Sequence, residues 1–168
     1  MTAGTLQNDT TPWMKFAYNN KALFIAQKSI RYGMSWDSLN AAAVATPGKT
    51  ITIGNYRYKC RLLLIAPADS GNSNSTLPGR EWSNLIYNVC TAGPSTKGWA
   101  AFTTADLGIG GSFNGRYNWG QESGTATSGA GRAGVGYTTI NKLDFNASGN
   151  TGTHMGWRPC LELVGKIA

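Results

Sequence analysis

The last residues of the chain constrain its fold more than any other stretch. Between positions 156 and 164 two sets of residues alternate, with Trp157, Pro159, Leu161 and Leu163 in one set and Arg158, Cys160, Glu162 and Val164 in the other. A period of two places each set on one face of a β-strand. Pro159 has no amide hydrogen, so we expect it near the start of this strand or at a sheet edge. Such an apolar terminal strand needs partners from earlier in the chain, which predicts that the N- and C-terminal portions meet in one sheet.

Length and composition indicate one loop-rich domain. The chain has 168 residues, of which 22 are Gly and 14% are charged, while 41% are hydrophobic. This is enough apolar material for a core without metal or disulfide support, and it favours a β-rich globular fold over a helical or disordered one. The sequence predicts an α+β domain over residues 13–168, with residues 1–12 as an N-terminal extension.

Two hairpins are predicted in the first half. Residues 13–18 and 21–26 flank an Asn-Asn pair, and Asn tolerates the left-handed backbone of a two-residue turn. Residues 51–53 and 56–65 flank Gly-Asn in the same way. The strand beginning at Tyr56 alternates and then becomes wholly apolar, as a strand does when both faces are covered. It is the expected partner of the terminal strand.

Two short helices are also predicted. Ser35 is suited to cap a helix over residues 36–45, which Thr46-Pro47-Gly48 would end. A second helix should begin at Glu81, because apolar residues follow at helical spacing until Gly93. A loop is expected over residues 66–79.

The segment from about 92 to 155 is rich in Gly, Ser, Thr and Asn, with aromatic residues at intervals. Long irregular connections inside a compact domain are usually functional, and the aromatics argue against disorder. Short strands are predicted at 117–121 and 134–140. Five polar or aromatic residues of this segment are the candidate ligand-binding residues: Tyr117, Asn118, Tyr137, Thr138 and Asn141. Tyr and Asn are typical of binding surfaces built from loops, although Tyr also fills cores.

Charge and hydropathy exclude several classes of protein. The net charge is +7, but the basic residues are scattered, and the nearest approach to a cluster is Arg57, Lys59 and Arg61 on one strand. This disfavours nucleic-acid binding and favours a basic surface that meets an acidic partner. No run is long enough to cross a membrane, and the N-terminus lacks the features of a signal peptide. We expect synthesis in the cytoplasm, where the product stays unless another route releases it.

The sequence offers little that would support catalysis. His154 is the one histidine, and no nucleophile motif accompanies it. Glu81 and Glu162 lie where they can pair with Arg or cap amides. We expect no catalytic residues, no cofactor and no metal site. The three cysteines, Cys60, Cys90 and Cys160, suit buried positions, and a Cys60–Cys160 disulfide stays an open alternative.

A series of motifs spans nearly the whole chain: Trp13-Met14-Lys15-Phe16, Lys21-Ala22-Leu23-Phe24-Ile25, Ile30-Arg31-Tyr32-Gly33-Met34-Ser35-Trp36-Asp37, Tyr58-Lys59-Cys60-Arg61-Leu62-Leu63, Glu81-Trp82-Ser83-Asn84-Leu85-Ile86, Asn118-Trp119-Gly120-Gln121-Glu122 and Gly156-Trp157-Arg158-Pro159-Cys160-Leu161-Glu162. The series resembles a family of bacteriophage and prophage virion proteins over residues 13–164. In that family the module often forms the distal part of tail-associated or surface-displayed proteins.

The final third also resembles the C-type-lectin-like fold of formylglycine-generating enzymes and of the variable receptor-binding proteins of diversity-generating phages. Four residues are assigned structural roles: Trp119, Glu122, Trp157 and Arg158. Arg158 is expected to stack on an aromatic ring and to pair with a carboxylate such as Glu122. No cysteine lies between 91 and 159, which disfavours oxidase chemistry. The Glu-Pro-Asn and Trp-Asn-Asp motifs of animal lectins are absent, which disfavours calcium-dependent sugar binding.

The resemblance implies a non-enzymatic virion protein of the tail-fibre or tail-tip type, which binds a host-surface glycan or protein through its late loops. The alternative is a capsid or tail decoration protein that contacts other virion subunits without a host ligand. The chain starts directly before the module and lacks a shaft, which favours this alternative. Both roles imply a homo-oligomer or attachment to a symmetric particle, because weak contacts gain from multivalency.

Overall fold

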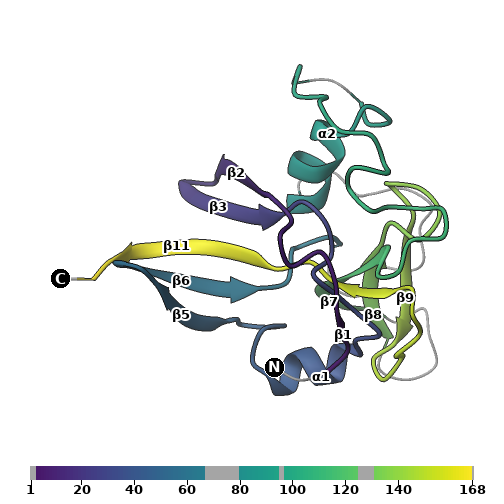
Figure 1. The fold of residues 1–168 in the computed structure, drawn as a ribbon, viewed down its shortest axis with the longest axis horizontal. Coiled ribbons are helices and arrows are strands. Elements are labelled where there is room, and N and C mark those ends of the chain that lie inside the picture. Colours follow the sequence, from purple (N-terminus) through teal and green to yellow (C-terminus); the bar gives the residue numbers. More distant parts are fainter. Residues whose placement is uncertain (1–2, 67–79, 95–96, 125–130, 168) are drawn as a thin grey trace.

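The computed structural model describes residues 3–66, 80–94, 97–124 and 131–167, and within them the chain forms two β-sheets with short helical segments (Figure 1). The six-stranded sheet has the order β1-β4-β10-β7-β8-β9, and the five-stranded sheet has the order β2-β3-β11-β6-β5. Helix α1 lies at one side of the sheets, and the η1–α2 helical segment lies at the other. The fold is mainly β and belongs to the α+β class.

The elements have the following bounds. The six-stranded sheet contains β1 (Thr5–Leu6), β4 (Arg31–Tyr32), β7 (Tyr117–Gly124), β8 (Gly131–Val135), β9 (Leu143–Ala147) and β10 (Met155–Trp157). The five-stranded sheet contains β2 (Trp13–Tyr18), β3 (Lys21–Ala26), β5 (Lys49–Ile53), β6 (Tyr56–Arg61) and β11 (Cys160–Lys166). The helical elements are α1 (Trp36–Ala41), the π-helical η1 (Trp82–Ile86) and α2 (Tyr87–Val89).

The C-terminal stretch forms two strands in two different sheets, so the prediction of a single strand is wrong. β10 ends at Trp157 and β11 begins at Cys160. Pro159 supplies no amide hydrogen at this junction, while its carbonyl accepts a hydrogen bond from the amide of Ala26 at 3.2 Å. Cys160 is as buried as Leu161, so both faces of β11 are covered at its start and the alternation there does not separate core from solvent.

The expected meeting of the two ends of the chain is confirmed. β11 lies between β3 and β6, with Leu161 opposite Phe24 on one side and Cys60 on the other. Both predicted hairpins are present as β2–β3 and β5–β6. Asn19 and Asn20 adopt the left-handed backbone, with φ values of 49° and 58°. The second hairpin ends at Arg61 rather than at residue 65, because the chain then leaves the sheet and Leu63 bridges to Gly120 of β7.

Both predicted helices form, but each is shorter than expected. The Ser35 hydroxyl accepts the amide of Ser38 at 3.1 Å and caps α1, as predicted. The helix ends at Ala41 and not at residue 45, and Ala43 has a φ of 59°, which no α-helix continues through. Glu81 precedes the second helical segment, which buries Trp82, Leu85 and Ile86.

The later strands are predicted less well. β7 starts at Tyr117 as expected and extends to Gly124, whereas β8 covers 131–135 rather than 134–140. Gly136, with a φ of 94°, turns the chain away directly after β8. Strand β9 is not anticipated. The loop expected at 66–79 lies, from residue 67 on, outside the described residues. The expected N-terminal extension supplies β1, which pairs with β4, so this part of it belongs to the fold.

Two hydrophobic clusters form the core. One joins the inner face of β2 and β3 to Trp82 and the helical segment, and the other joins α1 to Trp119 and Trp157. Among the described residues, no helix is sufficiently long and apolar to cross a membrane. Both clusters include residues of the segment from 107 to 157, and they hold the predicted ligand-binding residues of that segment against the two sheets.

Candidate functional site

A pocket of about 330 Å³ opens beside the six-stranded sheet, and we call it the aromatic pocket. Its lining consists of three ring-bearing and three polar side chains: Tyr117, Tyr137, His154, Asp144, Asn146 and Asn150. Tyr117 comes from β7, Asp144 and Asn146 come from β9, and the others come from the loops after β8 and β9. Its volume is within the range of small-ligand sites.

The rings of the aromatic pocket stack edge to face. Tyr137 meets Tyr117 at a centroid distance of 5.9 Å and an angle of 84°, and it meets His154 at 5.2 Å and 66°. The guanidinium of Arg116 lies 4.6 Å from the centroid of the Tyr137 ring, and its Nε donates to the Tyr137 carbonyl at 3.2 Å. Tyr137 is 39% exposed although it is held on three sides. The pocket therefore presents a fixed aromatic surface to solvent.

The polar side of the pocket follows from the pleat of β9. Leu143 and Phe145 are buried, so the alternate residues Asp144 and Asn146 point to the other face, where they line the pocket. Asn146 Oδ1 accepts a hydrogen bond from Asn150 Nδ2 at 3.3 Å. Carboxylate and amide groups side by side supply both acceptors and donors to a bound ligand.

The protonation of the two inner rings is set by burial. Burial, with the nearby Arg116 cation, lowers the pKa of His154, so its imidazole is neutral at pH 7. Burial raises the pKa of Tyr117, and Asn146 near its hydroxyl opposes part of that rise. The Tyr117 hydroxyl makes no hydrogen bond of standard geometry to a described residue. The pocket is thus neutral apart from Asp144 and the adjacent Arg116.

The structure brings together only two of the five predicted ligand-binding residues, Tyr117 and Tyr137. Asn118 is 2% exposed and its amide is fully used in the interior, so it is a structural residue rather than a surface one. Thr138 and Asn141 lie in the turn after Tyr137 but do not line the pocket, and Asn141 Oδ1 accepts from the Thr139 hydroxyl at 2.9 Å.

Four pocket residues were not selected from the sequence: Asp144, Asn146, Asn150 and His154. A signal for two of them was present, because Leu143-Asp144-Phe145-Asn146 alternates apolar and polar residues as a half-buried strand does. The sequence presents His154 only as a histidine without an accompanying nucleophile motif. Its ring contacts with Tyr117 and Tyr137 depend on the pairing of β10 with β7, which joins segments distant in sequence.

The four residues assigned structural roles are all buried, at 1 to 9% exposure: Trp119, Glu122, Trp157 and Arg158. The expected ion pair between Arg158 and Glu122 is wrong. Glu122 instead accepts the amide of Ile65 at 3.0 and 3.2 Å. The Arg158 guanidinium donates to Asn118 and to main-chain carbonyls, and it lies 5.5 Å from the centroid of the Trp82 ring, which agrees with the expected stacking.

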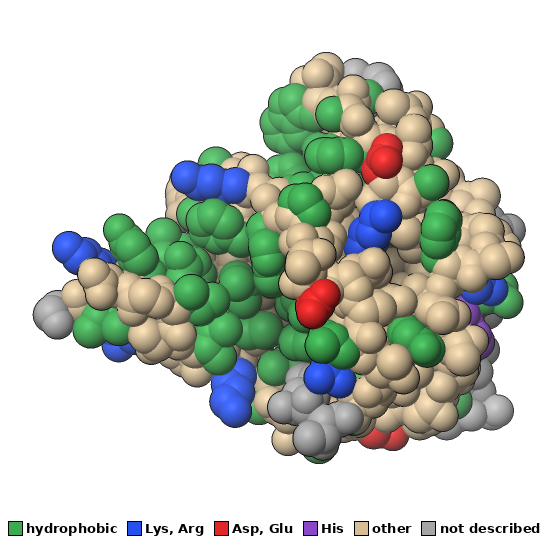
Figure 2. All heavy atoms as spheres, in the orientation of Figure 1, with side chains coloured by type: hydrophobic (Ala, Val, Ile, Leu, Met, Phe, Trp, Pro, Cys, Tyr) green, Lys and Arg blue, Asp and Glu red, His purple; other side chains and the backbone are tan. Residues whose placement is uncertain are grey.

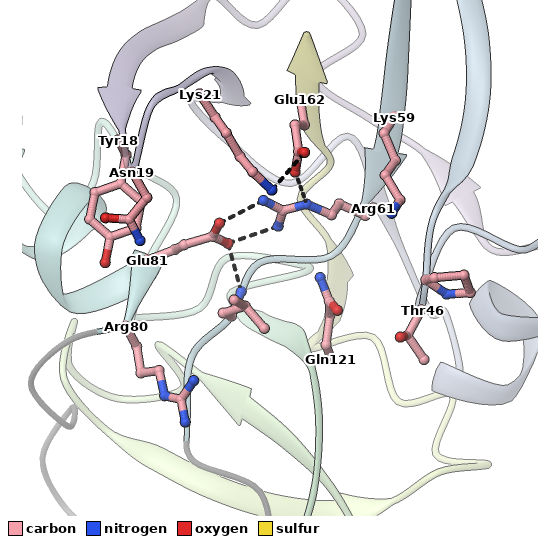
Figure 3. A pocket seen from close by; sticks show the side chains of 12 residues that line it. Tyr18, Asn19, Lys21, Thr46, Lys59, Arg61, Arg80, Glu81, Gln121 and Glu162 are labelled. Atoms are coloured by element: carbon pink, nitrogen blue, oxygen red, sulfur yellow. Dashed lines mark hydrogen bonds and ion pairs between the residues drawn. The ribbon is translucent and has the colours of Figure 1, made fainter. Parts of the chain in front are cut away.

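A second pocket of about 400 Å³, which we call the ionic pocket, lies between the five-stranded sheet and the start of η1 (Figure 3). Its lining includes six charged side chains: Lys21, Lys59, Arg61, Arg80, Glu81 and Glu162. Arg61 is at the centre, with Glu81 at 2.6 Å and Glu162 at 3.0 Å. The expectation that the two glutamates pair with Arg is confirmed. Burial alone would lower the pKa of Arg61, but the hydrogen bonds and charges of Glu81 and Glu162 outweigh burial and raise this pKa.

The cysteines are buried and free, so the Cys60–Cys160 disulfide does not form. Cys60 is paired with Leu161, and the side chain of the preceding Cys160 therefore points to the opposite face of the sheet. Burial raises the pKa of Cys60 to about 11 and that of Cys160 to about 12, which leaves both as unreactive thiols. No group of three or more His, Cys, Asp or Glu side chains suited to a metal ion occurs among the described residues.

Comparisons of the chain with models of protein families, with curated proteins and with solved structures give no match. We therefore infer its function from the two pockets and from the surfaces of the sheets.

Proposed function

We propose that this chain is a phage virion protein of the tail-fibre or tail-tip type that binds a host-surface glycan in the aromatic pocket. The observation that carries the proposal is the fixed, 39% exposed ring of Tyr137 beside Asp144, Asn146 and Asn150. A sugar ring has an apolar C–H face, which packs on an aromatic ring, and hydroxyls, which pair with amides and carboxylates. The pocket offers both kinds of surface within one small concavity.

The same pocket supports binding rather than catalysis. Hydrolysis of a glycoside usually uses two carboxyl groups facing the scissile bond, and among the described residues Asp144 is the one carboxyl group of the pocket lining. We extend the proposal to a C-type-lectin-like arrangement, in which late loops on a rigid sheet carry recognition. A single small pocket of this kind binds weakly, so we propose that the protein acts as a homo-oligomer or in several copies on the particle.

The test is binding of labelled chain to host cells and to a glycan array. Tyr137→Ala and Asn146→Ala should each abolish saturable binding, because one removes the ring face and the other removes polar contacts. Trp99→Ala is the matched control, since Trp99 is similarly exposed, at 43%, and lies outside the pocket. Binding that survives both pocket substitutions, or that Trp99→Ala removes as well, would refute the proposal.

A second candidate function, decoration of the capsid or tail, is favoured by one face of the five-stranded sheet. Cross-strand pairing puts Leu163, Tyr58 and Ile51 in one row. Further apolar side chains of this face, which we call the apolar face, are Trp13, Phe24, Ile53 and Tyr56. Trp13, Ile53 and Tyr56 are 42 to 50% exposed. Figure 2 shows hydrophobic side chains gathered over this sheet. Exposed apolar surface of this kind marks protein interaction sites.

The charges on the apolar face indicate the chemistry of such a partner. Strand alternation places Lys15, Lys49 and Lys166 on this face, and no carboxylate shares it in the described strands. Two copies placed face to face would oppose like charges, so the fitting partner is a virion subunit with an apolar centre and an acidic rim. Stoichiometric binding to particles assembled without the chain, lost in Tyr56→Glu but kept in Tyr137→Ala, would establish this function. Failure to bind such particles would exclude it.

A further inference from the structure

Strand β5 forms one edge of the five-stranded sheet, and its outer side is open. β6 lies on one side of β5, and no described strand lies on the other. Four of the five residues of β5 are exposed, and Ile51 is half-buried. Figure 1 shows β5 at the margin of this sheet, beside β6. The main chain of β5 is therefore accessible along one whole side.

The main-chain groups on this open side belong to two threonines. Ile53 and its partner on β6 flank the two-residue turn at Gly54-Asn55, so they form a hydrogen-bonded pair of the antiparallel ladder. Bonded and non-bonded pairs alternate along such a ladder, so Ile51 also bonds to β6. Thr50 and Thr52 therefore direct their amides and carbonyls away from β6. No turn or loop of the described residues bonds to the main chain of either threonine.

β5 also lacks the features that protect other edges of the two sheets. Natural edge strands are commonly blocked by a charge within the strand, by Pro, by a bulge or by being very short. β2 has Lys15 near its middle, β9 has Asp144, and β1 has only two residues. β5 has the sequence Lys-Thr-Ile-Thr-Ile, with its one charge at the first residue, and its register with β6 has no irregularity. A regular, β-branched edge of this kind is suited to pair with a further strand.

We propose that β5 pairs with β5 of a second copy of this chain, antiparallel, with Ile51 of each copy opposite Ile51 of the other. This contact rests on the homo-oligomer proposed above and gives it a specific interface. In this register Thr50 of each copy lies opposite Thr52 of the other, so the outward groups of both threonines are satisfied reciprocally. The Ile51 side chains meet on the apolar face, and the threonines pair on the opposite face.

The charges of the two copies stay apart in this register. Lys49 lies opposite Ile53 of the other copy, and the two lysines are separated by four residues at about 3.4 Å each, or about 14 Å. The basic residues of β6, Arg57 and Lys59, are three strand spacings, about 14 Å or more, from those of the other copy. Both separations exceed the screening length of about 8 Å at physiological ionic strength. Pairing at the edge thus avoids the like-charge contacts of two copies placed face to face, and it joins their apolar faces into one surface.

Sedimentation of the full chain over a concentration series, at physiological ionic strength, should show a reversible monomer–dimer equilibrium. Thr50→Pro should raise the dissociation constant of the dimer at least about tenfold, because Pro removes an outward amide and keeps every hydrogen bond to β6. Ala17→Pro is the matched control, since Ala17 has the corresponding outward position on β2, at the opposite edge of the same sheet. It should leave the dissociation constant nearly unchanged. Urea unfolding shows whether both variants are folded.

Two cysteine variants test the register. Ile51→Cys should give a disulfide-linked dimer when treated with oxidised glutathione, because opposite residues of a non-hydrogen-bonded pair have Cα atoms about 4.5 Å apart, within reach of a disulfide. Ile53→Cys is the matched control, since the two positions 53 lie about 14 Å apart in this register and should not be linked. The three native cysteines are buried, so they contribute little background.

A chain that is monomeric at every concentration, a dimer that Thr50→Pro leaves intact, or equal linking of the two cysteine variants would overturn the proposal. A chain that stays monomeric but loses its binding to particles in Thr50→Pro would show that a strand of another virion subunit occupies the edge, which also overturns pairing with a second copy. The glycan site is tested separately, because each copy carries its own aromatic pocket. Thr50→Pro should keep the binding of a soluble glycan, and Tyr137→Ala should keep the dimer.

Discussion

Arg158 Nε donates to Asn118 Oδ1 at 2.9 Å, and this bond joins the link between β10 and β11 to the start of β7. The same guanidinium donates to the carbonyls of Gln27, at 2.6 Å, and Leu107. Asn118 in turn accepts from the Ser29 hydroxyl at 2.8 Å and donates to the Arg116 carbonyl at 2.8 Å. One buried cation thus holds both sheets and a late loop together at the point where the chain passes between sheets.

Arg158→Met should destabilise the fold by about 2 to 4 kcal/mol, because it leaves several buried acceptors without donors. Arg158→Lys should recover only part of this, since one ammonium cannot span the same carbonyls. Burial lowers the pKa of Arg158 to about 9, so the group is still charged at pH 7. Urea unfolding measures the change, with exposed Arg57→Met as control. Equal stability of the Arg158 and Arg57 variants would contradict this role.

Local signals predicted the first half of the chain well. The Asn19-Asn20 turn and the Ser35 cap each depend on a residue type with one strong local preference. These features are independent of distant packing. The sequence therefore predicts them almost to the residue.

The later half depends on contacts between distant segments, which alternation does not reveal. β10 and β11 look like one strand because the alternation treats Arg158 as an ordinary polar position. In the structure its guanidinium is buried and donates to carbonyls of two other segments, residues 26–27 and Leu107. The sequence suggests a ligand-binding role for Asn118 because it does not reveal that this residue is buried. In the structure the Asn118 side chain accepts a hydrogen bond from the same Arg158 guanidinium. The sequence predicts Tyr117 and Tyr137 of the aromatic pocket and misses the other four lining residues, which β9 and the loop after it bring to the two tyrosines.

A double-mutant cycle should show that Arg61 and Glu81 are strongly coupled. Arg61→Met alone leaves Glu81 as an unpaired buried charge, which costs about 3 to 5 kcal/mol, whereas Glu81→Leu leaves Arg61 its pair with Glu162 and should cost less. The double variant removes both charges and should cost less than the sum by about 1 to 3 kcal/mol. Chemical unfolding of the four proteins measures this coupling. Additive effects would mean that the pair contributes little beyond its separate contacts.

Gly156 is predicted to tolerate no side chain. A Cβ at this position would lie 2.1 Å from the Gly115 carbonyl oxygen and 2.7 Å from Ser29 Oγ, and the first of these is main chain that cannot rotate away. Gly156→Ala should therefore lower the free energy of unfolding by about 1 to 3 kcal/mol. Gly165→Ala is the control, because a Cβ there meets no atom within 4 Å. Thermal unfolding compares the two variants. Equal melting temperatures would show that the backbone around Gly115 and Gly156 moves apart without a cost in stability.

Glu122 should make stability fall as pH rises through neutrality. Burial raises the pKa of Glu122 to about 7 from an ordinary value of 4.5, so the folded state retains a proton that the unfolded chain releases. This contribution is fully present below about pH 4.5 and is lost as pH rises through 7, a change on the order of 3 kcal/mol.

Glu122→Gln keeps an acceptor for the amide of Ile65 and removes the ionisable group. Urea unfolding at pH 5 and pH 8 should show that the native protein loses stability relative to this variant at the higher pH. The difference between the two proteins isolates Glu122 from the other titrating groups. Parallel pH profiles would mean that the carboxylate is accommodated in its charged form, with the Ile65 amide compensating for its burial.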